Sequence, residues 1–135
     1  MNDVALIAAG ALGLVAAAAH GMGGEVFVMR KLSPGTLPPT RFGGGRGTRL
    51  MIHATWHTTT IAYLAVGVAL LLSGSVLDGD ARRSLGLTGA AAATGFAALN
   101  CGMGVAYARS PRFLTRHSGP ALITLSAALA WLGAL

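Results

Sequence analysis

Four long apolar stretches, separated by shorter polar segments, make up most of the chain. They run from about Val4 to Met29, Leu50 to Ser73, Ser84 to Ala108 and Gly119 to Leu135. A helix rises about 1.5 Å per residue, so roughly 20 apolar residues cross the roughly 30 Å hydrocarbon core of a bilayer. The pattern predicts an all-α polytopic membrane protein, an up-down bundle of four transmembrane helices in a single domain, residues 1–135.

The composition agrees with this prediction. Hydrophobic residues make up 53% of the chain, charged residues 10%, and the mean hydropathy is +0.63, whereas a soluble domain carries roughly 25% charged residues. The net charge of +6 is spread over the gaps between apolar stretches, which is typical of membrane topology and argues against nucleic-acid binding. Cys101 is the single cysteine, so a disulfide scaffold is excluded.

The first apolar stretch is expected to be a permanent helix. It follows Met1-Asn2-Asp3, which has no positive charge, and it is longer than the hydrophobic region of a secretory signal peptide. The connection after it, about residues 30–48, is rich in proline and glycine. We expect this connection to be a mobile cytoplasmic loop.

Lysine and arginine predict the orientation in the membrane. The second connection holds only Arg82 and Arg83, with Asp78 and Asp80 beside them. The first and third connections hold the other basic residues: Arg30, Lys31, Arg41, Arg46, Arg49, Arg109, Arg112 and Arg116. The positive-inside rule therefore places these two connections in the cytoplasm and both termini outside a bacterial plasma membrane. The lipid bilayer is the expected partner, with anionic lipid near the arginines.

Small residues predict close packing of the helices. The chain has 20 glycines. Small residues recur in the first and third stretches at Gly10, Ala17, Gly21, Gly24, Gly86, Ala90, Ala93, Ala97 and Gly104. They let membrane helices approach until van der Waals contact holds them together.

Polar side chains inside the apolar stretches are the candidates for function, because ionisable groups in lipid are costly and usually face the bundle interior. One polar residue of each helix falls roughly 12–15 Å from the cytoplasmic end: His20, His57, Asn100 and Thr124. A second set lies closer to that end: Glu25, His53 and His117. Glycines at 21, 23 and 24 are expected to unwind the first helix locally.

The spacing of two histidines points to metal chemistry. His53 and His57 are four residues apart, so they share one helix face and can ligate one ion. Glu25 could add a carboxylate and His20 a third nitrogen, a set that suits zinc, copper or non-haem iron. Alternatively, His20 and His57 could bind a haem b axially. The supporting polar residues are Arg49, Trp56, Asn100, His117 and Thr124.

Other interpretations of the same residues stay open. The polar groups could hold the helices together by hydrogen bonds, with Asn100 bonding between helices and Glu25 pairing with Arg30 or Arg49. They could also form a proton or solute path. The chain as a whole is then a metal-handling or redox protein, a non-catalytic accessory subunit that binds other membrane subunits or itself, or a small transporter. Whether it is an enzyme is left open, since no nucleophile–base pair, phosphate loop or paired carboxylates are visible.

Two short motifs resemble those of a family of small bacterial four-helix integral membrane proteins. The first is AH-x3-GE, from Ala19 to Glu25, and the second is an arginine followed by WH-x-T, from Arg49 to Thr59. The resemblance covers the first half of the chain and implies no activity. It does imply that its matched residues belong to one site: His20, Gly24, Glu25, Arg49, Trp56 and His57.

Overall fold

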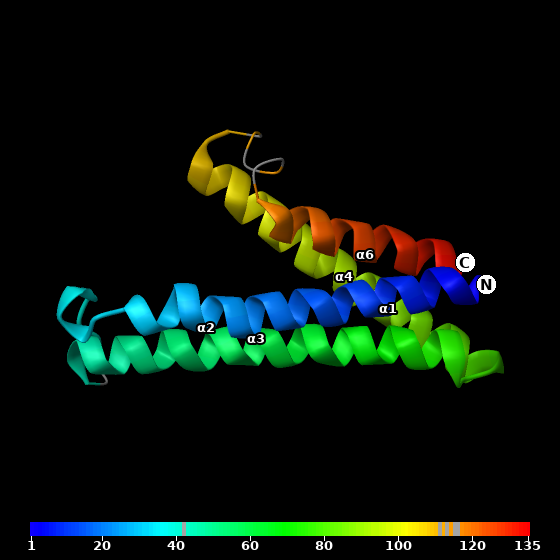
Figure 1. The fold of residues 1–135 in the computed structure, drawn as a ribbon, viewed down its shortest axis with the longest axis horizontal. Helices are drawn as coiled ribbons and strands as arrows, with labels where there is room; N and C mark the ends of the chain where they lie inside the picture. Colours follow the sequence, from blue (N-terminus) through cyan, green and yellow to red (C-terminus); the bar gives the residue numbers. More distant parts are fainter. Residues whose placement is uncertain (42, 111, 113, 115–116) are drawn as a thin grey trace. The chain divides into compact units, whose positions relative to one another are not determined.

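A computed structural model describes residues 1–135 except 42, 111, 113 and 115–116. Its long helices are α1 (Asp3–Ala18), α3 (Gly44–Ser75), α4 (Gly79–Ala108) and α6 (Ser118–Ala134), drawn in Figure 1. Within the described residues there is no strand, only an isolated bridge between residues 40 and 44. The prediction of an all-α protein is confirmed. Arg116, which was counted among the topogenic charges, lies outside the described residues.

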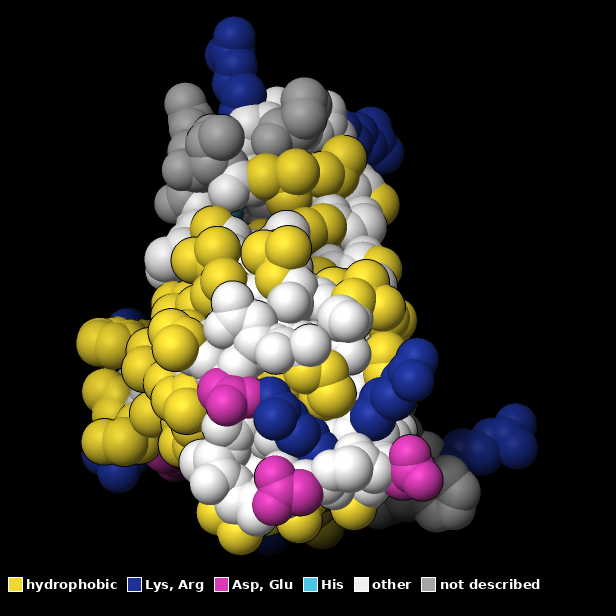
Figure 2. Space-filling view, turned by 90° about the vertical axis from the view of Figure 1, so that its right-hand side faces the viewer, with side chains coloured by type: hydrophobic (Ala, Val, Ile, Leu, Met, Phe, Trp, Pro, Cys, Tyr) yellow, Lys and Arg dark blue, Asp and Glu magenta, His cyan; other side chains and the backbone are white. Residues whose placement is uncertain are grey.

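In the part of the chain that the structure describes, three helical segments are long and apolar enough to cross a membrane: Asp3–Lys31, Gly44–Ser75 and Gly79–Ala108. The fourth predicted stretch forms α6, an apolar helix of 17 residues. Large apolar side chains such as Val4, Leu64 and Leu132 are exposed, and Figure 2 shows hydrophobic side chains over much of the face it presents. Exposed apolar surface of this extent is typical of a protein that lies in a membrane.

The connection between the first two membrane-length segments is shorter than predicted. α3 begins at Gly44 and not near Leu50, so the last part of the expected loop is helical. Gly45 lies against the carbonyl oxygen of Pro34, where a Cβ atom would overlap that oxygen. Glycine therefore lets the helix begin in contact with the loop, which also contains the 3₁₀ turn η3 (Pro34–Thr36). The mobility of this loop stays a prediction.

One compact unit comprises Met1–Ala16 and Tyr63–Leu135. Leu6 and Leu70 are fully buried in its core among the alanines of α1, α4 and α6. The hydroxyl of Ser126 donates a hydrogen bond of 2.9 Å to the carbonyl of Ala9. The small residues predicted to pack on the third helix are all buried on α4: Gly86, Ala90, Ala93, Ala97 and Gly104. Close packing through small residues is confirmed.

The other compact unit comprises Ala17–Ala62. It contains the end of α1, the π-helical turn η1 (Ala19–Gly23), the short helix α2 (Gly24–Phe27), the 3₁₀ turn η2 (Met29–Lys31) and the first part of α3. All of the predicted metal ligands lie in this unit. The prediction that the whole chain is one membrane domain stays a prediction.

Candidate metal centre

The candidate site forms where the chain from η1 to η2 packs against the first part of α3. The local unwinding expected at the glycines takes the form of the π-helical turn Ala19–Gly23, and α2 follows it directly. π-Helical turns are rare and occur frequently at functional sites. This turn carries His20, and the short helix after it carries Glu25.

Two glycines allow these segments to approach α3 closely. A Cβ atom at Gly24 would overlap the indole ring of Trp56, and one at Gly21 would lie 2.7 Å from the methyl carbon of Thr60. A larger residue at either position would force this segment, or the side chain of Trp56 or Thr60, to shift. The small residues thus bring the carboxylate of Glu25 within reach of the histidines on α3.

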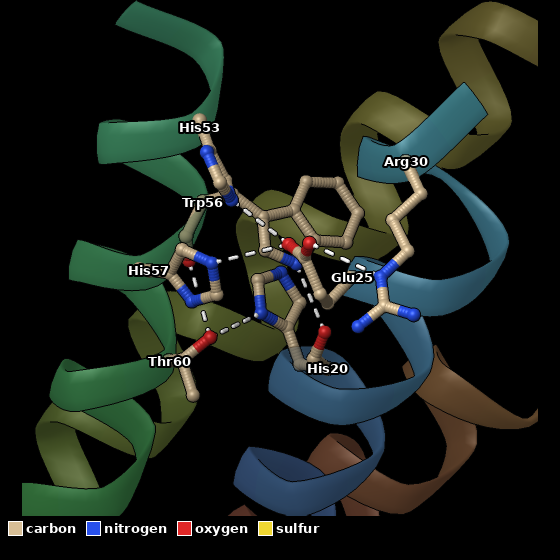
Figure 3. Close-up of polar contacts among 7 residues, drawn as sticks. All are labelled: His20, Glu25, Arg30, His53, Trp56, His57 and Thr60. Atoms are coloured by element: carbon tan, nitrogen blue, oxygen red, sulfur yellow. Dashed lines mark hydrogen bonds and ion pairs between the residues drawn. The ribbon is translucent and has the colours of Figure 1, made fainter. Parts of the chain in front are cut away.

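Glu25, His53 and His57 meet at one point (Figure 3). The Nε2 atom of His53 lies 2.8 Å from Oε2 of Glu25, and Nε2 of His57 lies 3.4 Å from the same oxygen. One ligand atom from each of the three residues lies within 4.8 Å of the other two. The rings of His53 and His57 are tilted at 54° with centroids 4.8 Å apart, as expected for residues one helical turn apart.

The other oxygen of Glu25 faces a cation. Nε of Arg30 forms an ion pair with Oε1 of Glu25 at 3.6 Å. This selects Arg30 from the two partners predicted for Glu25, since the described residues show no ion pair between Glu25 and Arg49. Arg49 lies half-buried on α3, one turn before His53.

His20 lies beside the three residues rather than among them. Its ring stacks on the indole of Trp56 with centroids 4.3 Å apart and an angle of 13°. Its Nδ1 atom is 2.9 Å from Oγ1 of Thr60, and Thr60 donates its hydroxyl hydrogen to the carbonyl of Trp56 at 3.2 Å. Because the hydroxyl hydrogen is used there, this network assigns the proton of the His20 ring to Nδ1.

Trp56 ties the π-helical turn to α3 in a second way. Its indole N–H donates a hydrogen bond of 2.9 Å to the backbone carbonyl of His20. A tryptophan N–H that is partly buried usually finds such an acceptor. The contact holds the backbone at His20, five residues before Glu25, so Trp56 supports the site although it offers no ligand atom.

The remaining supporting residues lie in the unit Met1–Ala16 and Tyr63–Leu135. Asn100 donates hydrogen bonds of 3.0 Å to the hydroxyl of Tyr63 and 2.9 Å to the carbonyl of Phe96. Since Tyr63 lies on α3 and Asn100 on α4, the expected hydrogen bond between helices is confirmed. Thr124 lies 3.7 Å from the sulfur of Cys101, and His117 precedes α6. The single polar layer through four helices stays a prediction.

The sequence alone does not single out Thr60, nor does it indicate that the carboxylate of Glu25 is divided between Arg30 and the histidines. Thr60 lies one turn beyond Trp56 on the same face of α3, and this spacing could have linked it to the site. The contact of Arg30 with Glu25 depends on the short helix α2 and the 3₁₀ turn η2. No helical periodicity in the sequence indicates that break.

Two imidazoles and one carboxylate form a donor set that suits zinc or non-haem iron, where open positions complete the coordination. A tetrahedral ion with bonds of about 2.1 Å separates its ligand atoms by about 3.4 Å. The separations of 2.8 and 3.4 Å between Glu25 and the histidines are close to that value. All three ligand atoms lie within 4.8 Å of one another, so side-chain rotations would be needed to enclose an ion.

Searches of protein-family models, curated proteins and solved structures found no match to this chain.

Proposed function

We propose that this chain is an integral membrane protein that binds one transition-metal ion through Glu25, His53 and His57. The observation that carries the proposal is the position of three ligand atoms within 4.8 Å of one another. They come from two different segments, since Glu25 and His53 are 28 residues apart in the sequence. The ion would serve metal handling or a redox role in the membrane.

Without a bound ion, the carboxylate of Glu25 has the two histidines as partners. Nε2–H of His53 donates to Oε2 of Glu25, and His57 faces the same oxygen. An ion takes the place of the hydrogens on these ring nitrogens, because a ligating histidine must offer a lone pair. The same geometry thus serves as a hydrogen-bonded cluster without metal and as a ligand set with it.

The positions of His20 and His57 suit a single ion better than a haem. Axial ligation of a haem needs the rings of His20 and His57 to approach one iron atom from opposite sides. The ring of His20 stacks on Trp56 at 4.3 Å, whereas His57 faces Glu25. Haem binding would break both arrangements, and ion binding retains them.

The first test is the metal content of the protein purified in mild detergent. We expect elemental analysis to give about one zinc, iron or copper ion per chain after metal loading and removal of excess metal. His117→Ala is the matched control, because it removes a histidine outside the cluster and should retain the ion. Protein that stays metal-free after loading with each of these ions would overturn the proposal. The accessory-subunit and proton-path interpretations would then be the ones to pursue.

We also propose that the chain crosses a bacterial plasma membrane four times, with α6 as the fourth span and both termini outside. The support is the excess of arginine and lysine in the first and third connections. Single cysteines at Arg46 and Asp80, in a Cys101→Ala background, test this orientation. A membrane-impermeant thiol reagent added to intact cells should label position 80 and spare position 46. Labelling of position 46 alone would mean that the orientation is the reverse of the one proposed. Labelling of both positions would overturn the proposal that they lie on opposite sides of the membrane.

A further inference from the structure

The carboxylate of Glu25 uses its two oxygens for different partners. Oε2 faces His53 and His57 at 2.8 and 3.4 Å. Oε1 faces Nε of Arg30 at 3.6 Å. In Figure 3 the side chain of Arg30 approaches Glu25 from the side opposite the two histidines. The two oxygens therefore have different partners. The histidines next to Oε2 can ligate a metal together with Glu25, whereas the positive charge of Arg30 next to Oε1 repels a metal.

A carboxylate can bind an ion through one oxygen or through both. Binding through both would turn Oε1 toward the ion and away from Arg30, and it would bring the guanidinium closer to a positive ion. Because the ion pair opposes that rotation, the arrangement favours ligation through Oε2 alone. Partners of this kind, which contact a ligand and not the metal, commonly orient metal sites.

A site with two histidine nitrogens and one carboxylate oxygen leaves at least one coordination position for another ligand. The protein itself does not close off this position. The side chains of Glu25, His53 and His57 are 28%, 41% and 45% exposed. A closed structural metal site would bury its ligands and supply a fourth from the protein.

The charge of this unit favours an anion as the outside ligand. Glu25 is the only acidic residue between residues 17 and 62. The same segment carries five basic residues: Arg30, Lys31, Arg41, Arg46 and Arg49. A divalent ion bound to one carboxylate keeps a net positive charge, which favours an anion as a further ligand.

We propose that Arg30 is a positioning residue that holds Glu25 to ligation through one oxygen, so that the bound metal keeps a position open for a small anion. The inference rests on the proposed metal site and adds the class of its outside ligand. Arg30 acts here through Glu25 and does not itself ligate the metal.

The test uses the full-length protein in detergent, loaded with saturating Co²⁺, whose visible spectrum reports the number and kind of ligands. Azide is the probe for the open position. We expect azide to change the cobalt spectrum of the unaltered protein. Because the Arg30 side chain is 68% exposed, the affinity for azide should be about fivefold weaker in Arg30→Met, the upper end for an exposed ion pair. Arg30→Lys should recover part of that affinity, because it retains a cation next to Oε1.

Lys31→Met is the matched control, since it removes a neighbouring positive charge without removing the partner of Glu25. Its azide affinity should stay within about twofold of the unaltered protein, because Lys31 is exposed and the described residues show no ion pair between it and Glu25. Equal losses in Arg30→Met and Lys31→Met would reduce the effect to overall charge and overturn the positioning role. A cobalt spectrum that does not respond to azide would overturn the open position. Failure to bind cobalt at all would instead overturn the proposed metal site.

Discussion

Replacing His57 with alanine should lower the affinity of the protein for zinc or cobalt about 100-fold. A four-ligand zinc site is worth about 10–16 kcal/mol, so one ligand contributes about 3 kcal/mol when this energy is divided evenly. Glu25→Gln should cause a similar loss of affinity, since glutamine has nearly the same shape as glutamate but lacks the charge that faces both histidines. Competition with a coloured chelator measures each affinity.

The same titration decides the role of His20. In the structure its ring stacks on Trp56 and its Nδ1 contacts Thr60, so we expect His20→Ala to weaken metal binding less than about 10-fold. A loss of about 100-fold would make His20 a fourth ligand, as the sequence analysis suggests. The ligand assignment would be wrong if His57→Ala and Glu25→Gln both kept the affinity of the unaltered protein. Helix content and a single elution peak in detergent confirm that each variant is folded.

Replacing Gly10 with alanine should destabilise the unit that contains α4 and α6 by about 1–3 kcal/mol. A Cβ atom at Gly10 would lie 2.7 Å from the carbonyl oxygen of Gly67 and 2.8 Å from the backbone nitrogen of Leu71. Both are backbone atoms of α3, which cannot rotate away as a side chain can. The variant should therefore unfold at a lower mole fraction of denaturing detergent in mixed micelles, followed by circular dichroism.

Gly95→Ala on α4 is the control for that change. A Cβ atom there would meet no other atom within 4 Å, so the substitution should be neutral or stabilise the helix by up to about 1 kcal/mol. If Gly10→Ala were as stable as Gly95→Ala, the close approach of α1 and α3 at Gly67 would not contribute to stability. The contrast separates packing from helix propensity, because both variants make the same chemical change inside a helix.

The sequence predicts the helical class and the pairing of His53 with His57 because both depend on local regularities. A long apolar stretch indicates a membrane-length helix, and a spacing of four residues places two side chains on one face of α3. The predicted contact between Asn100 and another helix also follows from a local rule, since a polar amide in an apolar helix needs a partner. Its identity as the hydroxyl of Tyr63 depends on packing and is not visible in the sequence.

The remaining details of the site depend on irregular backbone. The early start of α3 depends on how Gly45 contacts Pro34, a loop contact that no periodicity indicates. The choice of Arg30 over Arg49 as the partner of Glu25 depends on where α2 gives way to η2. Counting residues along the helices places Arg30 and Arg49 at membrane depths similar to that of Glu25. Only the three-dimensional path of the chain shows which of them contacts it.

The direction in which the Glu25 carboxylate points depends on the number of residues in the π-helical turn before it. Each residue of an α-helix turns its neighbour by about 100°, so residues five apart on an α-helix point in directions about 140° apart. His20 and Glu25 are five apart, yet both contact residues of α3, because the wider turn between them takes up the extra rotation. Met22 is 74% exposed within that turn. Deleting this one outward-facing residue would leave His20 and Glu25 four apart, a spacing that an ordinary α-helix places about 40° apart. The π-helical turn therefore takes up one extra residue while both side chains keep facing α3, and a chain without that residue should keep them on one face of an ordinary helix.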